Sequence, residues 1–241
     1  LTVAFWLWWT AFAADDKLAF ESSVNYNSNA GAILGDPDDS GTGLFTVNAR
    51  NAAAGGYSGV SFTRPSAGVW HHYAFTFDLG NVTRWVPNCW VDGVTPAGLI
   101  TAAGSSVTGP ATGFGNYTWY FMSRAAASLF GAGRFCEVAF WPGTLLAPTE
   151  VFRLAKGAPP SEVRPGALKY YWPIAADLNP DPAARSQAAR LVPVATPSVV
   201  AHAPVLPAVS PPRRLAGPPA AAFVAPAPLI VRQAVTRAAY Y

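Results

Sequence analysis

The sequence predicts an all-β protein: a two-sheet antiparallel jelly-roll sandwich with one short helical turn and an extended C-terminal arm rich in Pro and Ala. Two observations favour this class. The 21 glycines and 23 prolines indicate many turns and argue against long helices. Up to about residue 172 the chain also reads as short strands separated by turn signals, a pattern typical of sandwiches and jelly rolls.

The chain opens with the apolar run LTVAFWLWWTAFA, which is either a secretory segment or the first strand of the sandwich. A signal peptide needs a basic n-region, but no Lys or Arg precedes Lys17. The run is also shorter than the roughly 20 residues that span a bilayer. Large apolar residues stand at every odd position from 3 to 9, so we expect a strand and no membrane span. Because Leu1 is not Met, we expect the true N-terminus to lie upstream or to have been removed.

Seven further stretches have strand character, with turn signals such as LGN, VDGV and GAG between them. They are 17–26, 43–47, 57–63, 70–78, 88–92, 119–123 and 134–141. In HYAFTFD, Tyr73, Phe75 and Phe77 fall on one face. In EVAFW, Val138 and Phe140 share one face and the other three residues share the opposite one. Such faces close a core between two sheets about 10 Å apart.

One segment, LAPTEVFRLAKG, has a helical pattern. Pro148 and Thr149 lead into Glu150, an apolar face follows, and Gly157 ends the helix as its C-cap. The two cysteines, Cys89 and Cys136, are too few for a disulfide framework and lack metal-site spacing. Since each lies in a strand-like stretch, two separate buried thiols are our first interpretation, and a single bridge stays open.

The net charge of +3 is unevenly placed. Residues 1–150 carry six Lys or Arg against ten Asp or Glu, whereas residues 151–241 carry ten against three. A basic tail on an acidic body indicates nucleic acid, an anionic partner surface, or simply a tail that arginine keeps soluble. From residue 191 proline is frequent and apolar residues come in short runs, so we expect this part to lie extended against a partner.

The predicted organisation is a jelly-roll domain over 1–175, an extended segment over 176–210 that packs on or extends the sandwich, and a partner-docking arm over 211–241. We expect protein partners in a larger assembly to bind through residues 191–241. We expect no nucleic acid.

Several motifs, in their order and spacing, resemble laminin G-like domains of the concanavalin A-like jelly-roll class. They are GVWHHYAFTFD (68–78) followed by NCWVDGV (88–94), then GRFCEVAFWPGTLLAPTEVFRLAKG (133–157) and ALKYYWPI (167–174). LTVAFWLWW fits the early Phe-Trp strand of that family. The resemblance covers roughly residues 1–175 and implies a jelly roll. It also implies a strand before the Phe-Trp strand, which this sequence lacks, so we expect a missing edge or one completed by the tail.

The same class includes glycoside hydrolases, which need two carboxylates across the scissile bond. No cluster of alternate acids occurs here: Glu137 stands alone in its strand and Glu150 belongs to the helical turn. His71 and His72 are neighbours in a strand, so they point to opposite faces and cannot chelate one ion together. We therefore expect no catalytic residues and no enzyme.

The loop GDPDDSGTG (35–43) is the best candidate for a metal site, because Asp36, Asp38 and Asp39 supply the hard oxygen ligands that Ca²⁺ prefers. The resemblance adds that laminin G-like domains often bind calcium at one rim, although through residues with no match here. The spacing is not that of an EF-hand, and the same residues make a plain surface turn. No other cofactor is expected.

The sequence thus predicts a non-enzymatic structural or binding module on a surface. Our first hypothesis is a virion protein, a phage capsid decoration or tail protein anchored through its C-terminal arm. The alternative is a secreted or cell-surface lectin-like module. In the alternative, exposed aromatics of WLWW or NYTWYF (116–121) bind the glycan. The predicted location is the virion surface, the extracellular space or the cell surface.

Overall fold

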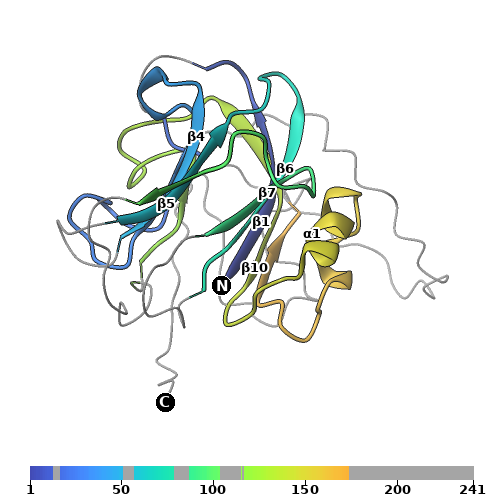
Figure 1. Ribbon diagram of the computed structural model, residues 1–241. Helices are drawn as coiled ribbons and strands as arrows, with labels where there is room; N and C mark the ends of the chain where they lie inside the picture. The colour runs from blue at the N-terminus through green and yellow to red at the C-terminus, as the bar shows by residue number, and fades with distance from the viewer. Residues whose placement is uncertain (13–16, 51–56, 79–86, 104–114, 116, 174–241) are drawn as a thin grey trace, which may run out of the picture.

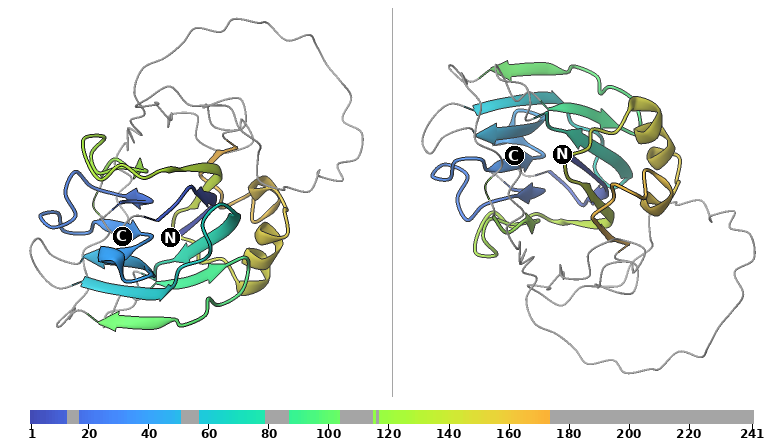
Figure 2. Two further views of the ribbon diagram at one scale, coloured as in Figure 1. Left: turned by 90° about the horizontal axis from the view of Figure 1, so that it is seen from above. Right: turned by 90° about the horizontal axis from the view of Figure 1, so that it is seen from below.

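The computed structural model describes residues 1–12, 17–50, 57–78, 87–103, 115 and 117–173. It shows two antiparallel β-sheets packed face to face, with one short helix on the outside of one sheet (Figures 1 and 2). The predicted two-sheet jelly-roll sandwich is confirmed. Residues 176–210 and 211–241 lie outside the described residues, and the docking role of 191–241 stays a prediction.

The strands divide into a five-stranded and a six-stranded sheet. The five-stranded sheet contains β1 (Thr2–Trp9), β6 (Trp70–Thr76), β7 (Asn88–Val91), β10 (Gly133–Trp141) and β11 (Tyr170–Trp172). The six-stranded sheet contains β2 (Phe20–Glu21), β3 (Ile33–Asp36), β4 (Leu44–Arg50), β5 (Tyr57–Thr63), β8 (Ile100–Ala103) and β9 (Tyr120–Phe121). Their orders are β11-β10-β1-β6-β7 and β8-β5-β4-β3-β2-β9. Helix α1 spans Pro148–Ala155, and 3₁₀ turns span Asp39–Gly41 and Pro160–Glu162.

The opening apolar run forms β1, as the strand hypothesis predicted. This strand lies in the middle of the five-stranded sheet, antiparallel to β10 on one side and to β6 on the other. The expectation that an edge is missing or is completed by the tail involves residues outside the described ranges and stays a prediction. Among the described residues, the edges of this sheet are β11 and β7.

The core between the sheets is aromatic and follows the predicted alternation. Tyr73, Phe75 and Phe77 of the β6 stretch are all buried in it, together with the odd-numbered residues of β1. The rings of Phe45 and Phe62 stack at 5.2 Å between centroids, next to Tyr73. Burial of each such side chain contributes about 1.5–3 kcal/mol, so this cluster is the main source of stability.

Strand β3 was not predicted, because Gly35 and Asp36 were assigned to the turn GDPDDSGTG. The strand needs that glycine: a Cβ at Gly35 would lie 2.4 Å from Cε1 of Phe20 on β2. Strand β8, which pairs with β5, was also missed.

The strand predicted over 17–26 shortens to β2, because the chain turns immediately after it. The Glu21 carboxylate holds that turn by accepting hydrogen bonds from the Ser23 hydroxyl and the Tyr26 backbone N–H. The strand predicted over 119–123 likewise shortens to β9.

The two cysteines are buried and free, as the first interpretation had it. Cys89 faces the inner core, whereas Cys136 packs with Trp6 on the outer side of the five-stranded sheet. Within the described part of the chain, no helix is long and apolar enough to cross a membrane.

Candidate functional site

The outer face of the five-stranded sheet carries three cross-strand rows of very different size. In each row one residue of β10, one of β1 and one of β6 lie directly opposite each other. They are the alanine row (Ala139, Ala4, Ala74), the middle row (Cys136, Trp6, His72) and the tryptophan row (Arg134, Trp8, Trp70). The outward side chains therefore increase in size along β1, from methyl groups at Ala4 to indole rings at Trp8.

The alanine row lies beneath α1. Its three methyl groups form one apolar cluster with Val151 and Leu154 of the helix. Small side chains let the helix approach the sheet closely. Thr2 holds the segment before α1 against β1. The Thr2 hydroxyl donates to the Thr144 carbonyl at 2.8 Å and accepts from the Leu146 N–H at 3.0 Å. Helix α1 thus covers one end of this face.

The predicted helix is confirmed, and Glu150 belongs to its first turn. Its Oε2 accepts a hydrogen bond from the Ala147 N–H at 2.7 Å, and its Oε1 accepts one from Arg164 Nε at 2.6 Å. Glu150 therefore has a structural role that accounts for both carboxylate oxygens.

A β-bulge brings Glu137 onto the same outer face. Ala4 pairs with Ala139 but Trp6 pairs with Cys136, so the register shifts by one residue between them. Glu137 has a φ of 53°, the left-handed conformation that a bulge residue adopts. The Tyr171 hydroxyl of β11 donates a hydrogen bond to its Oε2. The sequence placed Glu137 on this face correctly but gave no sign of the bulge.

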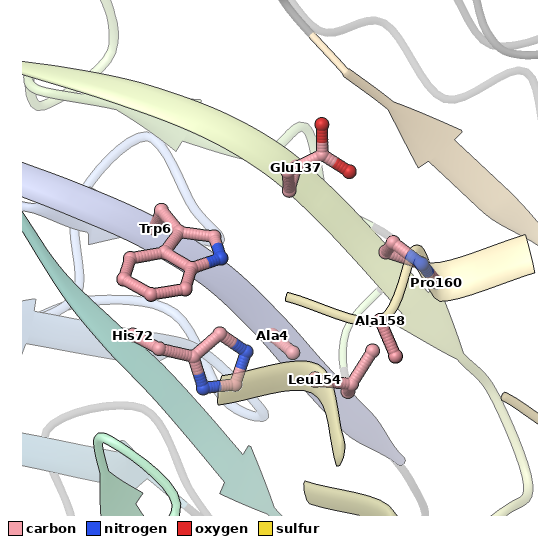
Figure 3. Close-up of a pocket in the computed structure, with 7 residues that line it drawn as sticks. All are labelled: Ala4, Trp6, His72, Glu137, Leu154, Ala158 and Pro160. Carbon is pink, nitrogen blue, oxygen red and sulfur yellow. The ribbon is translucent and has the colours of Figure 1, made fainter. Parts of the chain in front are cut away.

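A small pocket lies at the edge of α1, between the alanine and middle rows (Figure 3). Its lining residues are Ala4, Trp6, His72, Glu137, Leu154, Ala158 and Pro160. Trp6 on the central strand stands between His72 on β6 and Glu137 on β10 (Figure 3). The pocket has room for about one water molecule. It is too small for a sugar.

His72 is the unusual group in this pocket. Its side chain is 2 % exposed, its ring meets the Trp6 ring edge-on at 5.4 Å, and its Nδ1 has no hydrogen-bond partner among the described residues. Burial lowers the pKa of His72 to about 3, so its imidazole is neutral at physiological pH.

Asp92 ties the two histidines to the turn after β7. Its Oδ2 lies 2.7 Å from His71 Nδ1, and its Oδ1 accepts the His72 backbone N–H at 2.9 Å. Burial tends to raise the pKa of Asp92, but the hydrogen bonds from His71 and His72 outweigh it and hold that pKa below its usual value. His71 and His72 belong to opposite faces, as predicted.

The tryptophan row lies beyond the helix. Trp8 and Trp70 are partly exposed, whereas every other tryptophan in the described ranges is buried. Strand β7 pairs with β6 only from Tyr73 onwards, and β11 pairs with β10 only from Val138 onwards. At this end, therefore, the described sheet is only three strands wide, and the row occupies its full width.

The three predicted calcium ligands lie together in one loop, but each is already engaged. Asp36 Oδ1 accepts the Asp38 N–H at 2.9 Å, Asp38 pairs with Arg64, and Asp39 Oδ2 accepts the Thr46 hydroxyl at 3.1 Å. Across the described ranges, no group of three or more His, Cys, Asp or Glu side chains is arranged to hold a metal ion. Calcium at this loop stays a prediction.

Sequence reasoning found part of this site. The WLWW run indicated that one set of aromatics must face solvent or a partner, and Trp8 does so. Trp70 and Arg134 were missed, because only the pairing register shows that they lie beside Trp8. In the sequence, these two residues could be recognised only as large side chains that point outward from predicted strands.

No protein-family model matches the chain, and no curated protein matches its sequence. Among solved structures it is similar to the native heptameric SAP-like pentraxin from Limulus polyphemus. The identity is 13 % over 64 % of this chain and 68 % of that chain, with a TM-score of 0.42. The sandwich rests on the two antiparallel sheets of the described residues. The narrower laminin G-like assignment remains a prediction from the sequence motifs.

Proposed function

We propose that the chain is a non-enzymatic saccharide-binding module that holds its ligand on the tryptophan row. The observation that carries this proposal is the placement of Trp8 and Trp70. They lie directly opposite each other on neighbouring strands, partly exposed, in a protein whose other described tryptophans are buried. Two neighbouring indoles that keep part of their surface exposed form an aromatic patch of the kind that a ligand or partner covers.

An indole ring suits a sugar because the C–H face of a pyranose is apolar while its hydroxyl rim is polar. Tryptophan offers the same combination of a broad apolar face and a single donor, and it loses little side-chain entropy on binding. Here both rings project from the paired strands β1 and β6, which fix their spacing before the ligand arrives. Preorganisation of this kind raises affinity by lowering the ordering cost.

The carboxylates support a binding role without catalysis. Hydrolysis of a glycosidic bond requires two carboxyl groups about 5–9.5 Å apart. Of the residues that line the pocket between the alanine and middle rows, Glu137 alone carries a carboxylate; it is 6 % exposed and bonded to the Tyr171 hydroxyl. The Glu137 carboxylate thus links β10 to the edge strand β11, a structural role that does not involve a sugar.

The test is a screen of soluble oligosaccharides by calorimetry, followed by W70A. Stacking on an aromatic ring contributes about 1–3 kcal/mol, as measured for nucleic acid bases, so W70A should weaken the best ligand roughly tenfold or more. The matched control is F152A, because Phe152 is an aromatic residue of α1 that is 44 % exposed and lies outside the row. Equal losses for W70A and F152A, or no binding of any oligosaccharide, would contradict the proposal.

The virion hypothesis is compatible with this function but rests on other residues. A decoration or tail protein anchored through 191–241 would carry a saccharide-binding face on its exposed domain. That anchoring segment lies outside the described residues, so the virion assignment is supported only by composition and domain order. The same holds for a virion or cell-surface location.

A further inference from the structure

Arg134 completes the tryptophan row. Its guanidinium carbon lies 4.3 Å from the centroid of the Trp8 ring, and the side chain is partly exposed. It forms no ion pair with any described carboxylate. The contrast with other arginines is clear: Arg64 pairs with Asp38, Arg124 with Glu21, and Arg164 with Glu150.

The nearest acid along the strand does not compensate it. Glu137 follows three residues later, but it lies within the bulge, is 6 % exposed and accepts the Tyr171 hydroxyl. Arg134 therefore presents a positive charge at the end where the described sheet is three strands wide, next to two partly exposed indoles.

The position on Trp8 also orients the guanidinium. A guanidinium over an indole face gains cation–π energy and loses rotational freedom, while its N–H edge stays available. That planar edge matches a carboxylate or sulfate, which it binds through two parallel hydrogen bonds. A stacking surface and an anion donor thus lie side by side on one rigid sheet.

Resting on the proposed function, we infer that the saccharide is acidic. One ring stacks on the tryptophan row, and a carboxylate or sulfate of the sugar binds the N–H edge of Arg134. The competing explanation is that Arg134 only shields the Trp8 ring from water.

The test uses the full chain and a matched pair of probes: oligogalacturonate and its fully methyl-esterified form. The two share their rings and differ in charge. We expect the acid to bind about tenfold or more tightly than the ester, the size of a charge-assisted contact. The variant R134Q should remove this preference, so that the acid and the ester bind it with similar affinity. R134K, which keeps the charge but loses the planar fork, should retain only part of it.

Two further probes identify the source of the anion. A κ-carrageenan oligosaccharide carries sulfate but no carboxylate. If it outcompetes oligogalacturonate, with the same loss in R134Q, sulfate rather than carboxylate binds Arg134, and both probes are acidic saccharides. Oligothymidylate carries negative charge and stacking bases without sugar acids. If it binds more tightly than either saccharide, through the same residues, the inference is overturned.

The outcomes separate the two proposals. If W70A weakens acid and ester alike and R134Q changes neither, the saccharide function stands and the acidic preference is wrong. If R134Q weakens the acid and W70A changes nothing, the anion contact stands and stacking on the row is wrong. If no saccharide binds, both fail. Melting temperatures of the variants confirm that each is folded.

Discussion

His72 shows how one buried side chain links the fold to pH. Its imidazole lies beneath α1 with Nδ1 unpartnered in the described structure, beside the ring edge of Trp6. Burial lowers its pKa from 6.5 to about 3. Between these two pH values His72 is protonated in the unfolded chain but neutral in the folded chain. The stabilising effect of neutral His72 is complete above pH 6.5 and is lost as the pH falls towards 3.

We expect the free energy of unfolding to fall by about 2–3 kcal/mol between pH 7 and pH 4.5 on account of His72. The variant H72F keeps a ring in the pocket without a titrating nitrogen. Its free energy of unfolding should therefore lack this drop of about 2–3 kcal/mol between pH 7 and pH 4.5. The measurement is urea denaturation at a series of pH values.

His71 provides the control for this prediction. H71Q keeps a donor for Asp92 and leaves His72 in place, so it should retain the pH dependence of the parent. Asp92 itself, whose pKa lies below the usual 3.8, loses its stabilising effect only at a pH below the range measured. Parallel stability curves for H72F and the parent would show that another group is responsible.

At the level of residues, the sequence predicts which face of a sheet a side chain lies on better than it predicts the residue beside it on the next strand. Alternation alone separates Tyr73 and Phe75 from His72 and Ala74, because side chains along a strand alternate. It gives no sign of the bulge at Glu137, because the left-handed φ there depends on how β10 pairs with β1. For the same reason it missed Arg134 as the neighbour of Trp8, since register is a property of two strands.

At the level of elements, the alanine row determines how closely α1 packs. Ala74 is fully buried beneath the helix, opposite Ala4. A74L inserts three carbon atoms where none fit, so it should lower the free energy of unfolding by about 1–3 kcal/mol. Thermal and urea denaturation measure this. A132L at an exposed position should change stability by less than about 0.5 kcal/mol. Equal stability of A74L and the parent would show that the helix has room to shift.

Strand prediction succeeded where a strand is long and its two faces differ. The stretches of β1, β6 and β10 were recognised because apolar and other residues alternate in them over seven to nine residues. Strand β3 has four residues, includes a glycine and is buried on both sides, so it lacks that pattern. It exists because β2 and β4 pair with it, which no local sequence feature reveals.

At the level of the whole molecule, the described residues up to Trp172 already build two large buried apolar clusters. We therefore expect a chain that ends at residue 190 to stay folded, with a melting temperature within a few degrees of the full chain, and to keep its affinity for saccharide. Calorimetry and near-ultraviolet circular dichroism measure both.

The same truncation tests the anchoring arm. If 191–241 is the anchor, the shortened chain should no longer associate with the particle or cell surface to which the full chain binds. If it still associates and free sugar releases it, the tryptophan row is the attachment site and the arm hypothesis is wrong. Unfolding of the truncated chain would contradict the expectation that the domain is complete without the arm.

The separation of the tryptophans into buried and partly exposed sets gives the protein an intrinsic optical reporter. Of the eight in the described ranges, Trp8 and Trp70 are partly exposed and the other six are buried. Excitation at the red edge of indole absorption selects the solvent-relaxed pair, and a soluble quencher such as acrylamide reaches them first. Occupation of the row will then appear as a blue shift and reduced quenching of the native protein, without any attached dye.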